Sequence, residues 1–246
     1  LPVDRHGVRP DALRSALTDH PVLVYLQPTL HSPTGAILPA GRRSEIADAL
    51  ADARVPLVED HALAGLAWAD APPPVASRRP DHPGAVIGSL SKQLWGGRRV
   101  GFVRAPEPVA LRFARVKATH DLGSSAVSQL MAQRLLDHPD AAAFVSARNV
   151  ELHERHRTLA AALRRRLPAW DWDEPSGGLS LWVRLPHPVA EPFAQAALRA
   201  GVAVATAEAL SPSGEHRDRI RLSFSAPRDE LETGVDRLVA AWAPFA

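Results

Sequence analysis

Short apolar runs alternate with a helical pattern along the first part of the chain. Residues 22–27 and 55–58 are apolar runs of strand length that lead into polar residues, so both are expected to be buried parallel strands. Between them, residues 41–53 place apolar side chains at helical spacing and complete a strand, helix, strand unit. Residues 85–89 and 100–103 are further strand candidates. This order predicts an α/β fold whose strand ends carry polar groups.

The pattern changes past the middle of the chain. Stretches rich in Ala, Leu and Arg predict consecutive helices at 106–119, 124–136 and 141–167. Shorter elements follow: strands at 170–173, 179–185, 202–205 and 220–224, and helices at 189–200 and 229–242. We therefore divide the chain into a partial large domain (residues 1–150) and a long connecting helix with a small α+β domain (residues 151–246). The Pro-rich residues 71–83 are expected to form a surface loop.

Composition narrows the function classes. The hydrophobic fraction of 46% and the charged fraction of 23% are typical of a soluble globular protein, and no apolar run is long enough to span a bilayer. The first residues do not resemble a signal peptide, so a cytoplasmic location is expected. No cysteine is present, which excludes disulfides and thiolate metal sites, and no metal site is expected. The net charge of +2 offers no evident nucleic-acid-binding surface.

The strongest candidate chemistry surrounds one of the chain's two lysines, Lys92 and Lys117. Lys92 directly follows a predicted strand, lies next to Ser89 and Ser91, and precedes a Gly-Gly-Arg-Arg turn. An amine can form an imine with an aldehyde, while hydroxyls and a guanidinium bind phosphate. The pattern thus favours a site for an aldehyde cofactor that also carries a phosphate. A strand-to-loop turn with a surface lysine is the alternative.

Two further polar residues lie on predicted strands. Asp60 ends the strand that begins at residue 55, where the carboxyl ends of parallel strands gather ligands, and a carboxylate there can pair with a protonated pyridine nitrogen. A helix N-cap or a loop acid is the alternative. Arg221 alternates with apolar residues and can bind a carboxylate in bidentate fashion, or it faces solvent from an edge strand. Residues 31–35 have the composition of a tight turn.

Together these segments resemble the class I/II aminotransferases, which are fold-type I pyridoxal 5'-phosphate (PLP) proteins. The segments with matching order and spacing are residues 28–35, 58–60, 89–99, 176–178 and 221–224. The seven-residue step from Lys92 to Arg99 is most similar to the aminotransferase-like domain of MocR-type regulators in the GntR superfamily. The resemblance covers essentially the whole chain. It implies a mixed, mostly parallel sheet with flanking helices and a small C-terminal α+β domain.

The resemblance also implies roles for individual residues. Lys92 is the implied Schiff base lysine and Asp60 the implied partner of the pyridine nitrogen. The implied phosphate contacts are Ser89, Ser91 and Arg99. Arg221 is the implied clamp for the carboxylate of an amino acid, and the family's sites usually form in a homodimer.

Three departures from the family pattern are visible. Ser32 stands where the family has an Asn that contacts the cofactor, and Ala62 or Leu63 stands where a tyrosine is expected. Tyr25, the chain's single tyrosine, is on a predicted strand and is not expected to replace it. These losses favour ligand binding over efficient transamination. The family's large domain also normally begins well before a segment like residues 3–13, so we expect this chain to be the C-terminal part of a longer protein or a shortened gene product.

Three functions remain open at this stage. The first is the effector-sensing part of a MocR-type transcription regulator, which recognises an amino acid or amine and contacts DNA only through a domain absent from this chain. The second is a PLP-dependent aminotransferase that moves an amino group between an amino acid and a 2-oxo acid. The third is a remnant that binds no cofactor and serves only in association. No membrane partner is expected.

Overall fold

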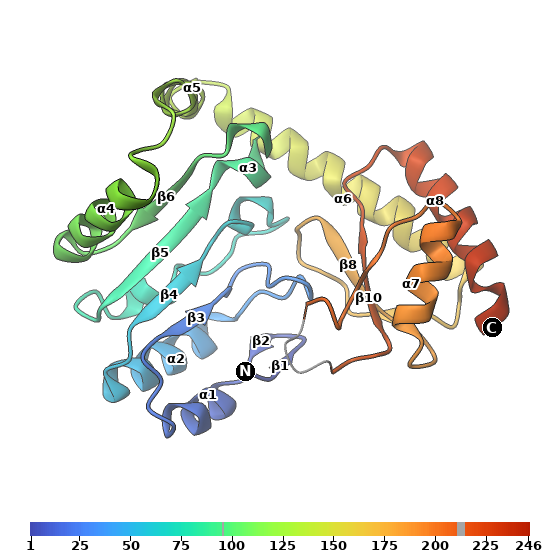
Figure 1. Cartoon of the computed structure of the whole chain (residues 1–246), viewed down its shortest axis with the longest axis horizontal. Coiled ribbons are helices and arrows are strands. Elements are labelled where there is room, and N and C mark those ends of the chain that lie inside the picture. Colours follow the sequence, from blue (N-terminus) through green and yellow to red (C-terminus); the bar gives the residue numbers. More distant parts are fainter. Residues whose placement is uncertain (95, 211–214) are drawn as a thin grey trace. The chain divides into compact units, whose positions relative to one another are not determined.

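The computed structural model describes residues 1–94, 96–210 and 215–246, so Trp95 of the segment around Lys92 lies outside the described residues, as does the side chain of Arg98. The chain divides into two compact units (Figure 1). The first comprises Leu1–Ser32 and Ala36–Ala147, and the second comprises Pro33–Gly35 and Arg148–Ala246.

A four-stranded sheet forms the centre of the first unit (Figure 1). Its strands follow one another in the order β3 (Val24–Leu26), β4 (Leu57–Asp60), β5 (Gly84–Ser89) and β6 (Gly101–Arg104). β3, β4 and β5 are parallel, whereas β6 runs antiparallel to β5. The expected mixed, mostly parallel sheet is confirmed.

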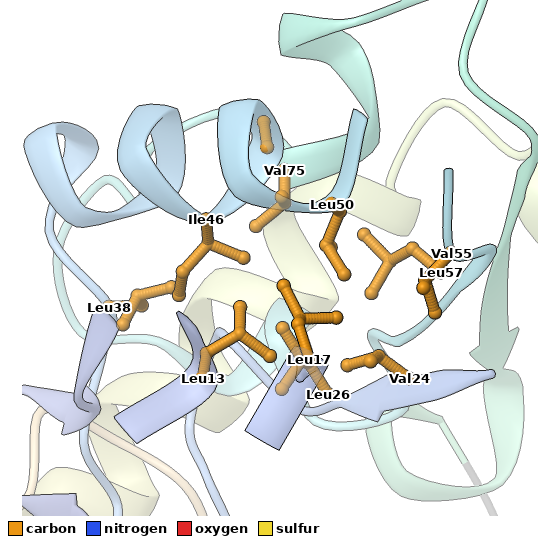
Figure 2. Packing of buried hydrophobic residues seen from close by; sticks show 11 residues of the cluster. Leu13, Leu17, Val24, Leu26, Leu38, Ile46, Leu50, Val55, Leu57 and Val75 are labelled. Carbon is orange, nitrogen blue, oxygen red and sulfur yellow. The ribbon is translucent and has the colours of Figure 1, made fainter. Parts of the chain in front are cut away.

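Helices α1 (Pro10–Leu17) and α2 (Ala40–Ala53) cover one face of this sheet. The side chains of β3 and β4 alternate between buried and less buried, so Leu26 and Leu57 point toward the helices. Figure 2 shows them packed with Ile46 and Leu50 of α2, which are fully buried. Because side chains alternate along a strand, Tyr25 of β3 and Asp60 of β4 face the opposite side of the sheet.

Further elements follow the sheet strands along the chain. A short helix α3 (Leu90–Gln93) follows β5, and α4 (Glu107–Asp121) and α5 (Ala126–Leu136) follow β6. The remaining elements of the first unit are the hairpin strands β1 (Val3–Asp4) and β2 (Gly7–Val8) and the 3₁₀ turns η1 (Ala64–Leu66), η2 (Val75–Arg78) and η3 (Gly96–Arg98). The strands β3, β4, β5 and β6 and the helices α2, α4 and α5 agree with the sequence pattern, whereas α1, β1 and β2 were not predicted.

An antiparallel sheet and three helices form the second unit. The strand order is β7 (Asp171–Trp172), β8 (Ser180–Arg184), β10 (Arg219–Ser223) and β9 (Ala205–Thr206). The helices are α6 (Ala141–Arg166), which begins in the first unit, α7 (Ala190–Arg199) and α8 (Arg228–Trp242), and a final 3₁₀ turn η4 covers Ala243–Phe245. Three aromatic rings, Trp170, Phe193 and Trp242, meet edge to face with centroids 5.3 Å apart in each pair. Such pairs add packing energy beyond the burial of their area.

Two local expectations are wrong. The strand expected at 202–205 is displaced to β9, which pairs with β10 only at Ala205 and Thr206. Residues 71–83 are not merely a surface loop, because η2 places Val75 in the core with no exposed surface. The proline-rich composition gives no sign of this buried valine, whose backbone N–H donates to the buried carboxylate of Glu59.

Among the described residues, no helix is long and apolar enough to cross a membrane.

Candidate functional site

The carboxyl ends of β4 and β5 bring two of the predicted site residues to one edge of the sheet. Asp60 is the last residue of β4, and Ser89 is the last residue of β5. Asp60 is paired in register with Ile87, so Ser89 lies two residues further along the neighbouring strand and on the same face. The backbone N–H of His61 donates to the carbonyl of Ile87 at 2.8 Å, which ties the two strand ends together.

Helix α3 carries Lys92 directly after β5. Its first turn is capped by Ser89, whose hydroxyl accepts a hydrogen bond from the backbone N–H of Ser91 at 3.2 Å. Leu90 is buried and anchors the helix, whereas Lys92 is exposed. The segment that follows Asp60 touches this helix, because a Cβ at Gly65 would overlap the side-chain amide of Gln93. The Asp60 and Lys92 segments are therefore neighbours.

Arg99 lies at the same edge of the sheet, just before β6, which neighbours β5 on the side away from β4. β6 pairs with β5 so that Gly101 lies opposite Ser89, and the N–H of Leu90 donates to the carbonyl of Val100 at 3.0 Å. Arg99 immediately precedes this contact and is exposed. Its φ of 54° lies in the left-handed region, which non-glycine residues rarely adopt and which occurs often at functional turns. The backbone thus brings Arg99 near the two serines.

The carboxylate of Asp60 has a partner on each oxygen. Oδ1 accepts a hydrogen bond from the backbone N–H of Ala62 at 2.7 Å, and Oδ2 accepts one from the hydroxyl of Tyr25. Partial burial, together with this hydrogen bond, raises the pKa of Tyr25 to about 12. From the sequence alone, Tyr25 was not expected to belong to the site. Only the register of β3 against β4, with Tyr25 opposite Val58, brings its side chain to the face that carries Asp60.

Ser32 lies in the loop that follows β3. Its hydroxyl-bearing side chain is exposed, and its backbone N–H donates to the side-chain oxygen of Gln27 at 2.9 Å. The N–H of His31 donates to the carbonyl of Ala36 at 2.9 Å, which closes the predicted tight turn. Ser32 therefore follows the carboxyl end of β3, next to the strand that ends in Asp60.

Arg221 belongs to the second unit. It lies on β10 between Ile220 and Leu222, which are both buried in the core of that unit, and is itself half-buried on the opposite face. In register, it pairs with Trp182 of β8 and Ala205 of β9, so β10 is an inner strand rather than an edge strand.

A buried ion pair joins α2 to β4 on the face of the sheet opposite Asp60. Arg43 of α2 and Glu59 of β4 have no exposed side-chain surface, and the guanidinium Nη1 lies 4.0 Å from Glu59 Oε1. The guanidinium donates to the carbonyls of Leu38, Pro28 and Pro73 and to the hydroxyl of Thr29. Sequence reasoning missed this pair, although an acid in the buried phase of a strand is a signal that a buried cation is needed.

Glu59 also fixes the chain on its own side. It accepts hydrogen bonds from the backbone N–H groups of Val75 at 2.8 Å and Ala76 at 3.0 Å, and lies 2.9 Å from Nε2 of His61. Burial alone would raise the pKa of Glu59, but the contacts with His61, Ala76 and Val75 hold it below the usual value. Glu59 and His61, the residues on either side of Asp60, thus contact each other, and Glu59 also binds the backbone at Val75 and Ala76.

Comparisons with known proteins agree with this architecture. Residues 2–238 match the family model "Aminotransferase class I and II". Two helix-turn-helix (HTH)-type transcriptional regulators of Bacillus subtilis, YisV and YdfD, are 33% and 30% identical over 96% and 97% of this chain. The chain spans about half the length of these two relatives, 49% and 50%. A 2-aminoadipate transaminase of Thermus thermophilus is 28% identical over 97% of this chain and 62% of its own length.

Solved structures support the same assignment. An α-aminoadipate aminotransferase from Thermus thermophilus, complexed with N-(5'-phosphopyridoxyl)-L-leucine, matches with a TM-score of 0.92 and 25% identity over 99% of this chain and 64% of its own. The expected fold-type I architecture and the resemblance to the aminotransferase-like part of HTH-type regulators are confirmed. PLP is accordingly the cofactor that goes with this fold. The family model covers nearly the whole chain, and the chain therefore belongs to the class I and II aminotransferase family.

Proposed function

We propose that this chain binds PLP at the carboxyl edge of β4 and β5, and that Lys92 is the amine that bonds to the cofactor's aldehyde. The single observation that carries this proposal is the parallel register that puts Asp60 and Ser89 on one face, with Lys92 three residues beyond Ser89. Ligands of open α/β sheets gather at such strand ends.

The chemistry of these side chains fits the cofactor. A carboxylate offers about four acceptor positions, and Asp60 uses two of them in the structure, so it retains capacity for the pyridine N–H. The hydroxyls of Ser89 and Ser91 and the guanidinium of Arg99 suit a phosphate dianion. Ser32 takes the position of the family's Asn, and Arg221 is assigned the carboxylate of the amino ligand. When bound, PLP would act as an electron sink for the electron pair left on the ligand's α-carbon when its proton is removed.

We assign the whole protein to transcription regulation, with this chain as its effector-sensing part. Support comes from the two HTH-type relatives, each matched along nearly all of this chain but only half of its own length. In such a protein, DNA binding belongs to a domain outside this chain, the ligand is an amino acid or amine, and the protein is a cytoplasmic homodimer. Ser32, Ala62 and Leu63, which replace the family's hydrogen-bond donors, favour binding without rapid turnover.

An aminotransferase is the second candidate. It is supported by the match to the 2-aminoadipate transaminase. The proton transfer that transamination needs would fall to the amine of Lys92, because a lysine can serve as both acid and base when its pKa is suitably placed.

Reduction of the cofactor-loaded, full-length protein with borohydride tests the site. Peptide mapping should place a pyridoxyl group on Lys92, and Lys92→Ala should abolish it. Lys117 is the matched control, because it is the chain's other lysine and pairs with Asp121 on α4. Lys117→Ala should leave the adduct unchanged. A pyridoxyl group on Lys117, or none at all, would show that the proposal is wrong.

A panel of amino donors separates the two candidates. For a sensor, an amino acid should perturb the absorption of the bound cofactor with little release of 2-oxo acid, and Arg221→Ala should remove the perturbation. Rapid multiple-turnover release of 2-oxo acid would support the aminotransferase instead.

A further inference from the structure

We infer that Tyr25 is a positioning residue that orients the carboxylate of Asp60 toward the ring nitrogen of the cofactor. The inference rests on the proposed function, because it assigns Asp60 to that nitrogen. It adds to the site a side chain of β3 that the sequence did not assign to it.

The backbone dictates that Tyr25 and Asp60 meet. Tyr25 is in register with Val58 on the adjacent parallel strand, and Asp60 lies two residues beyond Val58. Side chains two residues apart on a strand share a face, so Tyr25 and Asp60 are diagonal neighbours, within reach of a long aromatic side chain. Both lie on the face opposite the α2 core, since Leu26 and Leu57 point into that core.

The two hydrogen bonds on Asp60 together fix its carboxylate plane. The N–H of Ala62 alone holds one oxygen and leaves rotation about the bond to the carboxyl carbon soft, because this terminal torsion is broad. The Tyr25 hydroxyl holds the second oxygen and removes that freedom. A carboxylate fixed in advance presents its remaining lone pairs in one direction, which lowers the ordering cost of binding.

The charged residues on β4 and α3 have other partners or assigned roles, so we assign the orientation of the Asp60 carboxylate to Tyr25. Glu59, the neighbouring acid on β4, points to the opposite face and binds Arg43 and His61. Lys92 lies on α3, which follows β5, and the proposed function assigns it to the cofactor's aldehyde. Tyr25 is the chain's single tyrosine and donates its hydroxyl directly to Asp60.

A double-mutant cycle on PLP affinity tests the inference in the full-length protein. Tyr25→Phe removes one hydroxyl from a side chain that is 55% exposed, so the fold should tolerate it. In the parent protein it should weaken PLP binding about tenfold, the effect of losing one hydrogen bond to a charged group. In the Asp60→Ala background, Tyr25→Phe should have no further effect, because the carboxylate that it positions is gone. An equal loss in both backgrounds, or no loss in either, would overturn the inference.

A second measurement needs no cofactor. In protein labelled with ¹³C-tyrosine, Tyr25→Phe identifies the Cζ resonance of Tyr25, and Asp60→Ala should shift that resonance. Asp52→Ala, which removes an exposed acid on α2, should leave it in place. An unmoved resonance in Asp60→Ala overturns the inference even if Lys92 carries a pyridoxyl group. A moved resonance without any adduct on Lys92 instead overturns the proposed function, and with it the role of Tyr25.

Discussion

Two consecutive carboxylates, Glu59 and Asp60, show how differently the two faces of the first unit's sheet are used. Glu59 faces α2 and has no exposed side-chain surface, with a cation and two backbone N–H groups around it. Asp60 is half-buried on the other face and keeps acceptor capacity after its two hydrogen bonds. We call the face covered by α1 and α2 the closed face and the face that carries Asp60 the open face. The closed face thus holds the strand ends in place, and the open face presents polar groups at those ends.

The difference follows from what covers each face. On the closed face, α1 and α2 exclude water, so a charge there must be fully paired, and removal of one partner leaves the other charge stranded. On the open face, water reaches the side chains, so a lost contact is partly replaced by solvent. We therefore expect stability to depend on the closed face and ligand affinity on the open face.

The largest expected effect is that of Arg43→Met. It leaves Glu59 buried without its cation and strips several carbonyls of their donor, so the free energy of unfolding should fall by about 3–5 kcal/mol. Arg42→Met is the matched control, because Arg42 makes a partly exposed ion pair with Asp4 and should cost at most about 1 kcal/mol. Urea unfolding measures both. Equal losses from Arg42 and Arg43 would mean that burial between α2 and the sheet does not make the contacts of Arg43 more important than a partly exposed ion pair.

On the open face, Asp60→Ala should mainly affect binding. It should weaken PLP binding by about 1–3 kcal/mol, the range for the loss of a hydrogen bond to a charged group. The free energy of unfolding should change far less than in Arg43→Met. Isothermal titration and urea unfolding on the same preparation separate the two quantities. Unchanged affinity would return Asp60 to the role of a loop acid that caps Ala62.

The sequence predicts the strands and the residues at their ends much better than the contacts between elements. Short apolar runs identify β3, β4 and β5, and the position of Asp60 and Lys92 at or just after strand ends follows from local order alone. The contact of Tyr25 with Asp60 does not follow, because it depends on the register between strands whose residues are 35 positions apart. The pairing of Arg43 with Glu59 likewise depends on how α2 lies on β4, which no local pattern contains.

A smaller effect is expected from Ile46→Val, which removes one methylene from the closed face. Ile46 has no exposed surface and packs in the core beneath the sheet, so the change should cost about 0.5–1.5 kcal/mol of unfolding free energy. Val22→Ala removes apolar atoms from a side chain that is 91% exposed, and should change stability by less than about 0.5 kcal/mol. A larger loss from Val22 than from Ile46 would mean that the residues beside β3 are covered in the protein in solution.

The smallest expected effect is a pH dependence that comes from the open face. The charged form of tyrosine is the deprotonated one, and the folded protein raises the pKa of Tyr25 to about 12 from 10.0 through partial burial and the hydrogen bond to Asp60. The folded state therefore keeps the phenol proton more tightly than the unfolded state does. This contribution to stability is complete below pH 10 and is lost as pH rises from 10 toward 12. Because Tyr25 is more than half exposed, the change should be modest.

Urea midpoints at pH 9 and pH 11, compared between the parent and Tyr25→Phe, isolate the contribution of Tyr25, since the lysines and arginines titrate in both proteins. The parent should lose more stability than Tyr25→Phe over this interval. Parallel losses would mean that folding does not raise the pKa of Tyr25.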